Sequence, residues 1–128
     1  MSLKGDYDMA KILIVEDNEM NMRLFSDLLK TKGHQIFECL EGKKALNMAL
    51  EIKPDLILMD IQMPEVDGLT ATKLIRQEKE ISQTKIIAVT AFAMPGDLER
   101  ILAGGLDGYI SKPISIPDFL DTIEKVLE

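Results

Sequence analysis

The chain reads Ile12-Leu13-Ile14-Val15-Glu16-Asp17-Asn18 near its beginning, with four apolar residues followed at once by two acids and an amide. A strand in the centre of a parallel sheet is buried on both faces, so its sequence is almost continuously apolar rather than alternating. We interpret residues 12–15 as such a central strand. The acids would then begin the loop beyond its carboxyl end.

Short apolar runs return along the chain and alternate with segments of helical spacing. This alternation is typical of βα units, which build a parallel sheet covered by helices on both faces. Five units fit, so the predicted fold class is α/β with a five-stranded parallel sheet. The runs at 12–15, 56–59 and 86–89 are predicted to be central strands, the more polar run at 35–39 suits an edge, and 108–110 is a short fifth strand.

Apolar residues recur at intervals of three and four in two of the intervening segments. The first stripe consists of Ala45, Met48, Ala49 and Ile52, and the second of Phe119, Leu120, Ile123, Val126 and Leu127. Residues at this spacing share one face of a helix. We interpret both stripes as helix faces that pack against the sheet, not as cofactor-binding motifs.

The length of 128 residues is that of one ordinary domain. We predict a single domain over residues 11–128, preceded at residues 1–10 by a flexible tail or the end of a linker from a larger parent protein. No apolar run approaches the roughly 18 residues that suggest a membrane span, and the first residues lack the features of a secretory signal. A soluble, cytoplasmic protein without membrane contact is expected.

The net charge is -7, and no segment gathers Lys and Arg densely enough to neutralise a run of phosphates. Direct binding of nucleic acid is therefore not expected. The single Cys39 cannot form an internal disulfide, and with His34 alone it cannot supply the four ligands of a structural zinc site. We interpret Cys39 as a small strand residue.

Polar side chains follow four of the five predicted strands. Glu16 and Asp17 come after the first strand, Asp60 after the third, Thr90 after the fourth and Lys112 after the fifth. Right-handed crossovers bring the carboxyl ends of parallel strands to one edge of the sheet, where binding crevices form. We therefore expect these five side chains to gather at one edge.

Three carboxylates in a partly desolvated cleft repel one another unless a cation offsets their charge. Oxygen ligands suit Mg2+, which can also bind a phosphate oxygen. Lys112 would add a second positive charge, and the Thr90 hydroxyl could donate a hydrogen bond to a new oxygen. The sequence therefore predicts an acceptor site for phosphoryl transfer, where a protein mainly positions groups and stabilises charge.

Four segments, in chain order, resemble the receiver domains of two-component response regulators. They are Ile12-Leu13-Ile14-Val15-Glu16-Asp17-Asn18, Asp60-Ile61-Gln62-Met63-Pro64-Glu65-Val66-Asp67-Gly68, Val89-Thr90-Ala91 and Tyr109-Ile110-Ser111-Lys112-Pro113. Each motif alone is weak, but all four in order, each at a strand end, make a specific match over residues 11–127. The resemblance implies the flavodoxin-like (βα)5 receiver fold with strand order 2-1-3-4-5.

The resemblance also implies a phosphoacceptor and a metal site. Asp60 is expected to accept the phosphoryl group. Mg2+, with Mn2+ as an alternative ion, is expected to bind to Glu16, Asp17, Asp60 and the backbone carbonyl of Gln62. The acidic pair is Glu-Asp here, where many relatives have Asp-Asp.

Three further roles are implied around the phosphoryl group. Lys112 is expected to pair with it, and the peptide bond from Lys112 to Pro113 is expected to be cis, which is tolerable only before proline. Thr90 and Tyr109 resemble the switch pair of the family. Thr90 would turn toward the new oxygens, and Tyr109 would then turn inward.

The function implied is a phosphoacceptor in a two-component phosphorelay, not an enzyme that turns over a separate substrate. A histidine kinase or a histidine phosphotransfer protein would supply the phosphoryl group. A downstream protein would bind to the surface of the fourth helix, fifth strand and fifth helix, and the chain would be a monomer or a phosphorylation-dependent dimer. In relatives, the positions of Gln62 and Phe92 tune how fast the phosphoryl group is lost.

Some of these residues have simpler interpretations when taken singly. A strand-end acid such as Asp60 is usually a turn former or a helix cap. Asn18 and Asp67 are interpreted as caps, because each opens a helical stretch. His34 follows a helix and suits a surface or capping role rather than phosphodonor chemistry.

Three other functions would fit the same architecture. A flavin-binding loop after the first strand would be rich in hydroxyls, whereas this chain has Glu16 and Asp17 there. An aspartate-nucleophile phosphatase would have a second Asp where this chain has Glu19. A docking module that has lost phosphorylation would not need every chemical position, yet all are present. Whether the domain stands alone or belongs to a hybrid histidine kinase or longer regulator stays open.

Overall fold

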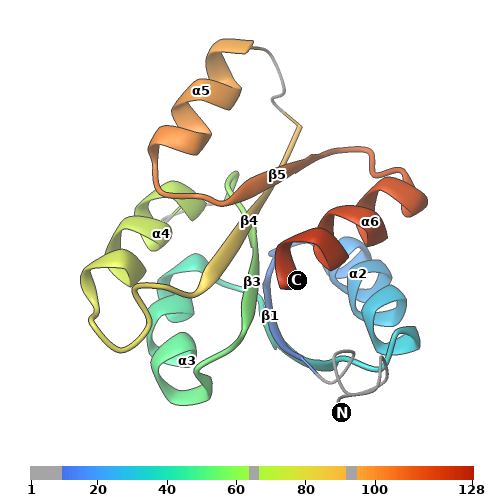
Figure 1. Ribbon diagram of the computed structural model, residues 1–128, viewed down its shortest axis with the longest axis horizontal. Coiled ribbons are helices and arrows are strands. Elements are labelled where there is room, and N and C mark those ends of the chain that lie inside the picture. Colours follow the sequence, from blue (N-terminus) through green and yellow to red (C-terminus); the bar gives the residue numbers. More distant parts are fainter. Residues whose placement is uncertain (1–9, 64–66, 92–94) are drawn as a thin grey trace.

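The computed structural model describes residues 10–63, 67–91 and 95–128. Within them, five parallel strands form one sheet in the order β2-β1-β3-β4-β5 (Figure 1). The strands are β1 (Lys11–Val15), β2 (Gln35–Cys39), β3 (Leu56–Asp60), β4 (Lys85–Thr90) and β5 (Gly108–Ser111). The predicted fold class and strand order are confirmed.

The three central strands are those with almost wholly apolar sequences. Every residue of β3 is buried, and β1 and β4 are buried at every position after the first. The more polar β2 lies at an edge and keeps exposed positions, as its sequence indicated. Burial on both faces therefore accounts for which strands are central.

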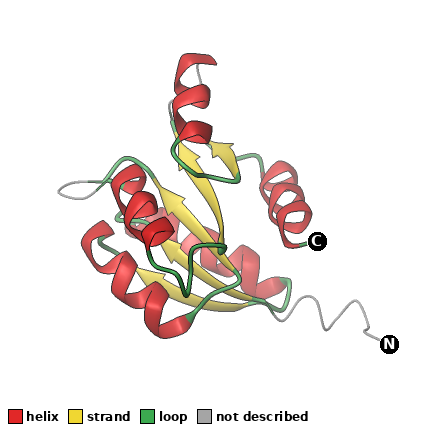
Figure 2. Ribbon diagram, turned by 60° about the vertical axis from the view of Figure 1, so that its left-hand side comes forward, coloured by secondary structure: helices red, strands yellow, loops and turns green. Residues whose placement is uncertain are grey.

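The helices form two layers, one on each face of the sheet (Figures 1 and 2). On one face lie α2 (Glu19–Thr31) and α6 (Ile116–Leu127), and on the other lie α3 (Ala45–Ile52), α4 (Gly68–Gln77) and α5 (Pro95–Ala103). A single 3-10 turn, η1 (Gly42–Lys44), precedes α3. The sheet is therefore the middle layer of three, with helices on both of its faces.

Each face of the sheet has its own hydrophobic core. On the α2 and α6 side, the rings of Phe25 and Phe119 stack with their centroids 5.3 Å apart. On the other side, Ala45 and Ala49 of α3 are fully buried against the strands. The two apolar stripes in the sequence are therefore helix faces packed against the sheet, as predicted.

Side chains cap α2 and α4, two of the helices that begin next to the carboxyl edge. Asn18 accepts a hydrogen bond from the Asn21 amide at 2.8 Å, and Asp67 accepts one from the Thr70 amide at 2.8 Å, which confirms both as caps. The backbone N–H of His34 donates to a carbonyl in the last turn of α2, as expected of a capping position. The His34 side chain, however, is buried rather than on the surface.

Arg76, in the last turn of α4, joins the chain segments that lead into β4 and β5. Its guanidinium donates to the carbonyls of Ser82 and Thr84 at 2.9 and 2.6 Å, and to that of Gly105 at 3.0 and 2.8 Å. It also pairs with Asp107 at 3.0 Å, and the same carboxylate oxygen accepts the Ile86 amide. The planar fork of one arginine therefore holds the amino ends of both strands in place.

Several predictions from the sequence concern residues outside the described part of the chain. They are the tail at residues 1–9, the motif residues 64–66, and Phe92. In the described part of the chain, Cys39 is a buried free cysteine at the end of β2, as predicted. None of the helices described there is long and apolar enough to cross a membrane.

Candidate functional site

The carboxyl ends of four neighbouring strands bring the predicted site residues to one edge of the sheet. Glu16 follows β1, Asp60 ends β3, Thr90 ends β4, and Lys112 follows β5. The strand register keeps these positions level, because Asp60 is paired with Val89 and Thr90 with Ser111 in adjacent strands. Parallel pairing thus gathers residues from four distant parts of the chain.

Three carboxylates form a cluster at this edge. Glu16, Asp17 and Asp60 each place one carboxylate oxygen so that all three oxygens lie within 4.8 Å of one another. Glu16 and Asp60 are 1% and 2% exposed, whereas Asp17 is exposed. Two of the three negative charges are thus largely removed from water.

Lys112 places its ammonium against the buried half of this cluster. The Nζ atom lies 3.3 Å from Asp60 Oδ2 and 3.4 Å from Glu16 Oε1. The Lys112 amide donates to the Thr90 carbonyl at 2.8 Å, which positions the segment after β5. The peptide bond to Pro113 is cis, as the resemblance implied.

Backbone amides provide the other contacts to the two buried acids. The Gln62 amide donates to Asp60 Oδ1 at 2.9 Å, and the Asn18 amide donates to Glu16 Oε2 at 3.1 Å. The other Glu16 oxygen, Oε1, is buried and accepts no hydrogen bond from the described residues, so its contact is the ion pair with Lys112.

The electrostatics of the cluster favour an added cation. Burial, and after it the negative charge of Asp60, raise the pKa of Glu16 from its ordinary 4.5 to about 7. The Asn18 amide and the Lys112 ammonium oppose this rise without cancelling it. Among the residues that the structure describes, three carboxylates face one ammonium, and Glu16 Oε1 is a buried oxygen without a hydrogen bond that could serve as a ligand. The site therefore suits a hard divalent ion.

The sequence matches the family model described as "Response regulator receiver domain" over residues 12–124. The chain belongs to the receiver domain family of response regulators. It is 53% identical over 116 residues to the polar-differentiation response regulator DivK of Brucella anthropi, a match that spans 91% of this chain and 94% of that protein.

Solved structures of other receivers have the same fold. Chemotaxis protein CheY4 of Vibrio cholerae superposes with a TM-score of 0.87 at 28% identity, over 92% of this chain and 98% of that one. The receiver domain of sensor histidine kinase PA1611 from Pseudomonas aeruginosa gives a TM-score of 0.85 at 32% identity, over 93% and 98% of the two chains. The latter structure has a magnesium ion coordinated in its active site cleft.

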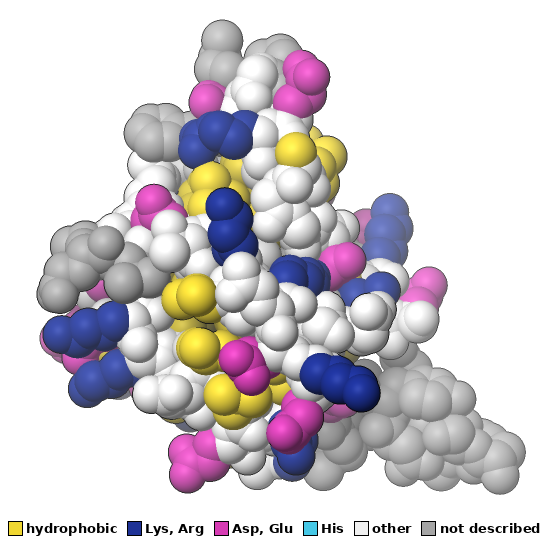
Figure 3. All heavy atoms as spheres, turned by 90° about the vertical axis from the view of Figure 1, so that its left-hand side faces the viewer, with side chains coloured by type: hydrophobic (Ala, Val, Ile, Leu, Met, Phe, Trp, Pro, Cys, Tyr) yellow, Lys and Arg dark blue, Asp and Glu magenta, His cyan; other side chains and the backbone are white. Residues whose placement is uncertain are grey.

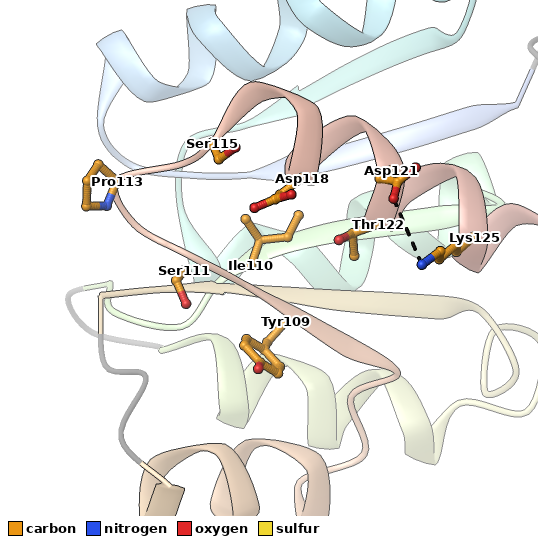
Figure 4. Close-up of a pocket in the computed structure, with 9 residues that line it drawn as sticks. All are labelled: Tyr109, Ile110, Ser111, Pro113, Ser115, Asp118, Asp121, Thr122 and Lys125. Carbon is orange, nitrogen blue, oxygen red and sulfur yellow. Dashed lines mark ion pairs between the residues drawn. The ribbon is translucent and has the colours of Figure 1, made fainter.

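The predicted switch residues of this receiver domain, Thr90 and Tyr109, lie on β4 and β5, the last two strands in the order of the sheet. Thr90 is fully buried at the end of β4, whereas Tyr109 on β5 is 38% exposed. Successive strand residues face opposite sides, and Ile110 packs in the core beneath α2 and α6. Tyr109 therefore projects toward the α5 side, as Figure 4 shows.

A groove of about 400 Å³ runs between β5 and α6 beside Tyr109 (Figure 4). Asp118, Asp121, Thr122 and Lys125 line its α6 wall, and an ion pair of 3.9 Å joins Asp121 to Lys125. The predicted output surface of the receiver domain thus has a polar groove at one border.

The sequence did not reveal two structural features of this site. In the sequence, Gly68 is only the last residue of one motif, yet a Cβ there would lie 2.5 Å from the Asp60 carbonyl oxygen, so α4 begins in close contact with the end of β3. The Gln62 side chain accepts a hydrogen bond from the Ala91 amide at 2.9 Å. Both depend on contacts between segments, which no local pattern encodes.

Proposed function

We propose that this receiver domain accepts a phosphoryl group on Asp60 and passes the change to a protein-binding surface. The proposal rests on the cluster at the carboxyl edge of the sheet. One carboxylate oxygen each of Glu16, Asp17 and Asp60 lies within 4.8 Å of the others, and Lys112 Nζ lies 3.3 Å from Asp60 Oδ2. Such an arrangement positions an anionic nucleophile and offsets the charge of an incoming phosphoryl group, which is most of what phosphoryl transfer requires of a protein.

In the proposed reaction, an oxygen of Asp60 attacks the phosphorus of a phosphohistidine on a partner protein. A P–O bond forms as the P–N bond breaks, and the bonding electrons return to the imidazole nitrogen. The product is an acyl phosphate, which water later hydrolyses. The Lys112 ammonium would stabilise the phosphoryl oxygens, and the Thr90 hydroxyl would donate to one of them.

The metal that fits the site is Mg2+, with Mn2+ as an alternative. Glu16, Asp17, Asp60 and the backbone carbonyl of Gln62 would hold it. The all-oxygen set supports this choice, as does the buried Glu16 Oε1, which accepts no hydrogen bond from the described part of the chain. When bound, the ion would neutralise the negative charge that the carboxylates and the phosphoryl group bring together.

The proposed partners follow from this chemistry. A histidine kinase or a histidine phosphotransfer protein would donate the phosphoryl group, and a downstream protein would bind the surface formed by α5, β5 and α6. Residues 11–128 would form the receiver unit, which would act in the cytoplasm as a phosphoacceptor rather than as an enzyme with a separate substrate. It would be a monomer or a phosphorylation-dependent dimer.

The substitution Asp60→Asn tests the assignment of the acceptor. Incubation with a small phosphodonor and Mg2+ should add one phosphoryl group to the wild-type chain, observed as intact mass, because the carboxylate supplies the nucleophilic oxygen. The variant should take up none, since its amide is a poor nucleophile.

Asp55→Asn is the matched control, because Asp55 precedes the same strand at the opposite edge of the sheet. It should retain full uptake. Stoichiometric uptake by the Asp60→Asn variant would show that another residue is the acceptor.

A further inference from the structure

The side chain of Gln62 bridges the loops that follow β3 and β4. Its Oε1 atom accepts a hydrogen bond from the Ala91 amide at 2.9 Å, while its own backbone amide donates to Asp60 Oδ1 at 2.9 Å. One residue therefore contacts the predicted acceptor with its backbone and the end of the adjacent strand with its side chain. Gln62 is partly exposed, so the side chain is free to leave this position.

The Ala91 amide lies next to the predicted acceptor site. Ala91 directly follows Thr90, the last residue of β4, and β4 is paired with β3 so that Val89 lies opposite Asp60. The Thr90 carbonyl accepts the Lys112 amide, so the backbone of β4 stays in the ladder up to Thr90. Ala91 N–H is thus the first amide beyond the ladder on this strand, and a side chain is its acceptor.

A phosphoryl group on Asp60 would add oxygens that are strong hydrogen-bond acceptors to this edge. The donors within the site are the Lys112 ammonium, the Thr90 hydroxyl and the amides of the two loops. The Gln62 amide already donates to Asp60. The Ala91 amide is committed to Gln62 Oε1 instead, and it can serve a phosphoryl oxygen only if that hydrogen bond breaks.

We propose that Gln62 is a positioning residue whose carboxamide competes with the phosphoryl group for the Ala91 amide. This inference rests on the proposed function of Asp60. In the unphosphorylated chain the carboxamide holds Ala91, and with it the end of β4, in the resting arrangement. Phosphorylation replaces the neutral acceptor with a charged one, which forms the stronger hydrogen bond. Gln62 then sets how readily the end of β4 rearranges.

The substitution Gln62→Met tests the competition, because methionine keeps the length of the side chain and replaces the carboxamide oxygen with a weak acceptor. Beryllium fluoride with Mg2+ serves as the phosphoryl mimic, and the Ala91 amide resonance is followed by NMR during the titration. The variant should bind the mimic about three- to tenfold more tightly, the effect of removing one competing neutral hydrogen bond. In the free protein, its Ala91 amide should exchange faster with solvent.

Two further variants make the result interpretable. Gln62→Asn keeps a carboxamide that is one methylene too short to span the loops, so it should behave like Gln62→Met. Gln83→Met introduces the same side chain at an exposed position before β4, at the other end of that strand, and should change neither affinity nor exchange. The thermal midpoint of each variant shows whether the fold is retained.

Unchanged or weaker binding of the mimic by both Gln62 variants would overturn the competition. Slower or unchanged Ala91 exchange in the free variants would do the same, and that measurement needs no phosphoryl mimic. If the wild-type chain fails to bind beryllium fluoride with Mg2+, the proposed function itself fails. The two failures are therefore distinguishable.

Discussion

Glu16 is the residue at which burial and charge act most strongly on the site. Its pKa of about 7 lies well above the ordinary 4.5, because its carboxylate is buried and faces the charge of Asp60. Between these two pH values the folded chain binds more protons at Glu16 than the unfolded chain does. The free energy of unfolding therefore decreases as the pH rises through this window.

The substitution Glu16→Gln should remove this pH dependence. Without divalent ions, the variant should have a higher free energy of unfolding than the wild type at pH 8, by on the order of 2 kcal/mol, because no buried charge forms. At pH 5 the two proteins should differ little. Urea unfolding in the presence of EDTA at both pH values measures the effect.

The control for Glu16 is Glu51→Gln, which changes an exposed glutamate of α3. It should leave the pH profile unchanged. Added Mg2+ should stabilise the wild type more than Glu16→Gln at pH 8, because binding is favoured by the charged carboxylate. An equal slope of stability against pH in the wild type and Glu16→Gln would contradict the role of burial.

At the scale of the element, the start of α4 is set directly against the end of β3. A Cβ atom on Gly68 would lie 2.5 Å from the Asp60 carbonyl oxygen and 2.6 Å from the Ile61 Cα atom. Both are backbone atoms at the end of a buried strand, so neither can move without displacing the strand. Gly68 thus lets α4 begin where Asp67 can cap it, beside the predicted acceptor.

The substitution Gly68→Ala should force α4 away from β3. We expect the free energy of unfolding to fall by about 1–3 kcal/mol, the usual effect of overpacking a buried contact. Gly96→Ala in α5 is the matched control, since a Cβ there meets no atom of the described residues within 4 Å. It should be neutral or stabilising by up to about 1 kcal/mol, because alanine favours the helix. Urea unfolding of both variants measures these free energies. An equal loss of free energy of unfolding in the two variants would contradict a close contact at Gly68.

At the scale of the whole molecule, charged side chains are distributed over the surface, whereas the predicted site residues lie together at one edge of the sheet. On the face in Figure 3, acidic and basic side chains surround hydrophobic ones. Among the described residues, the exposed large apolar side chains of α4 and α5 are those of Leu74 and Leu102. The net charge of -7 repels polyanions, which favours protein partners over nucleic acid. Tyr109 lies on β5, three strands along the sheet from β1, and belongs to the proposed output surface.

The movement of Tyr109 can be followed by its own fluorescence. The chain has no tryptophan and two tyrosines, so Tyr109 is the single emitter in a Tyr7→Phe background. Beryllium fluoride with Mg2+ should move Tyr109 from its 38% exposed position to a buried one, and quenching by acrylamide should fall roughly twofold as the population shifts.

The Thr90→Ala variant should bind the mimic, but its acrylamide quenching of Tyr109 should fall less. The alanine has no hydroxyl that could turn toward the phosphoryl oxygens and so make room for Tyr109. The coupling of Thr90 to Tyr109 would be contradicted if the protein that retains Thr90 bound the mimic but its Tyr109 fluorescence were quenched by acrylamide as strongly as before.

The local sequence was sufficient to predict the five strands of this receiver domain and the buried faces of two helices. Apolar runs predicted β1, β3 and β4 as central strands, because burial on both faces requires apolar side chains at successive positions. Acids and a lysine after strand ends predicted that a charged site lies at one edge of the sheet. The strand order and the residue roles, by contrast, came from the resemblance of four motifs to one family.

Only the tertiary structure decided how the site residues act on one another. The 3.3 Å contact between Lys112 and Asp60 joins residues 52 positions apart, and the raised pKa of Glu16 depends on burial that the whole sheet creates. The close approach at Gly68 and the hydrogen bond from Ala91 to Gln62 likewise join separate loops. Periodicity reports which face of an element is buried, but distances between elements are set by packing.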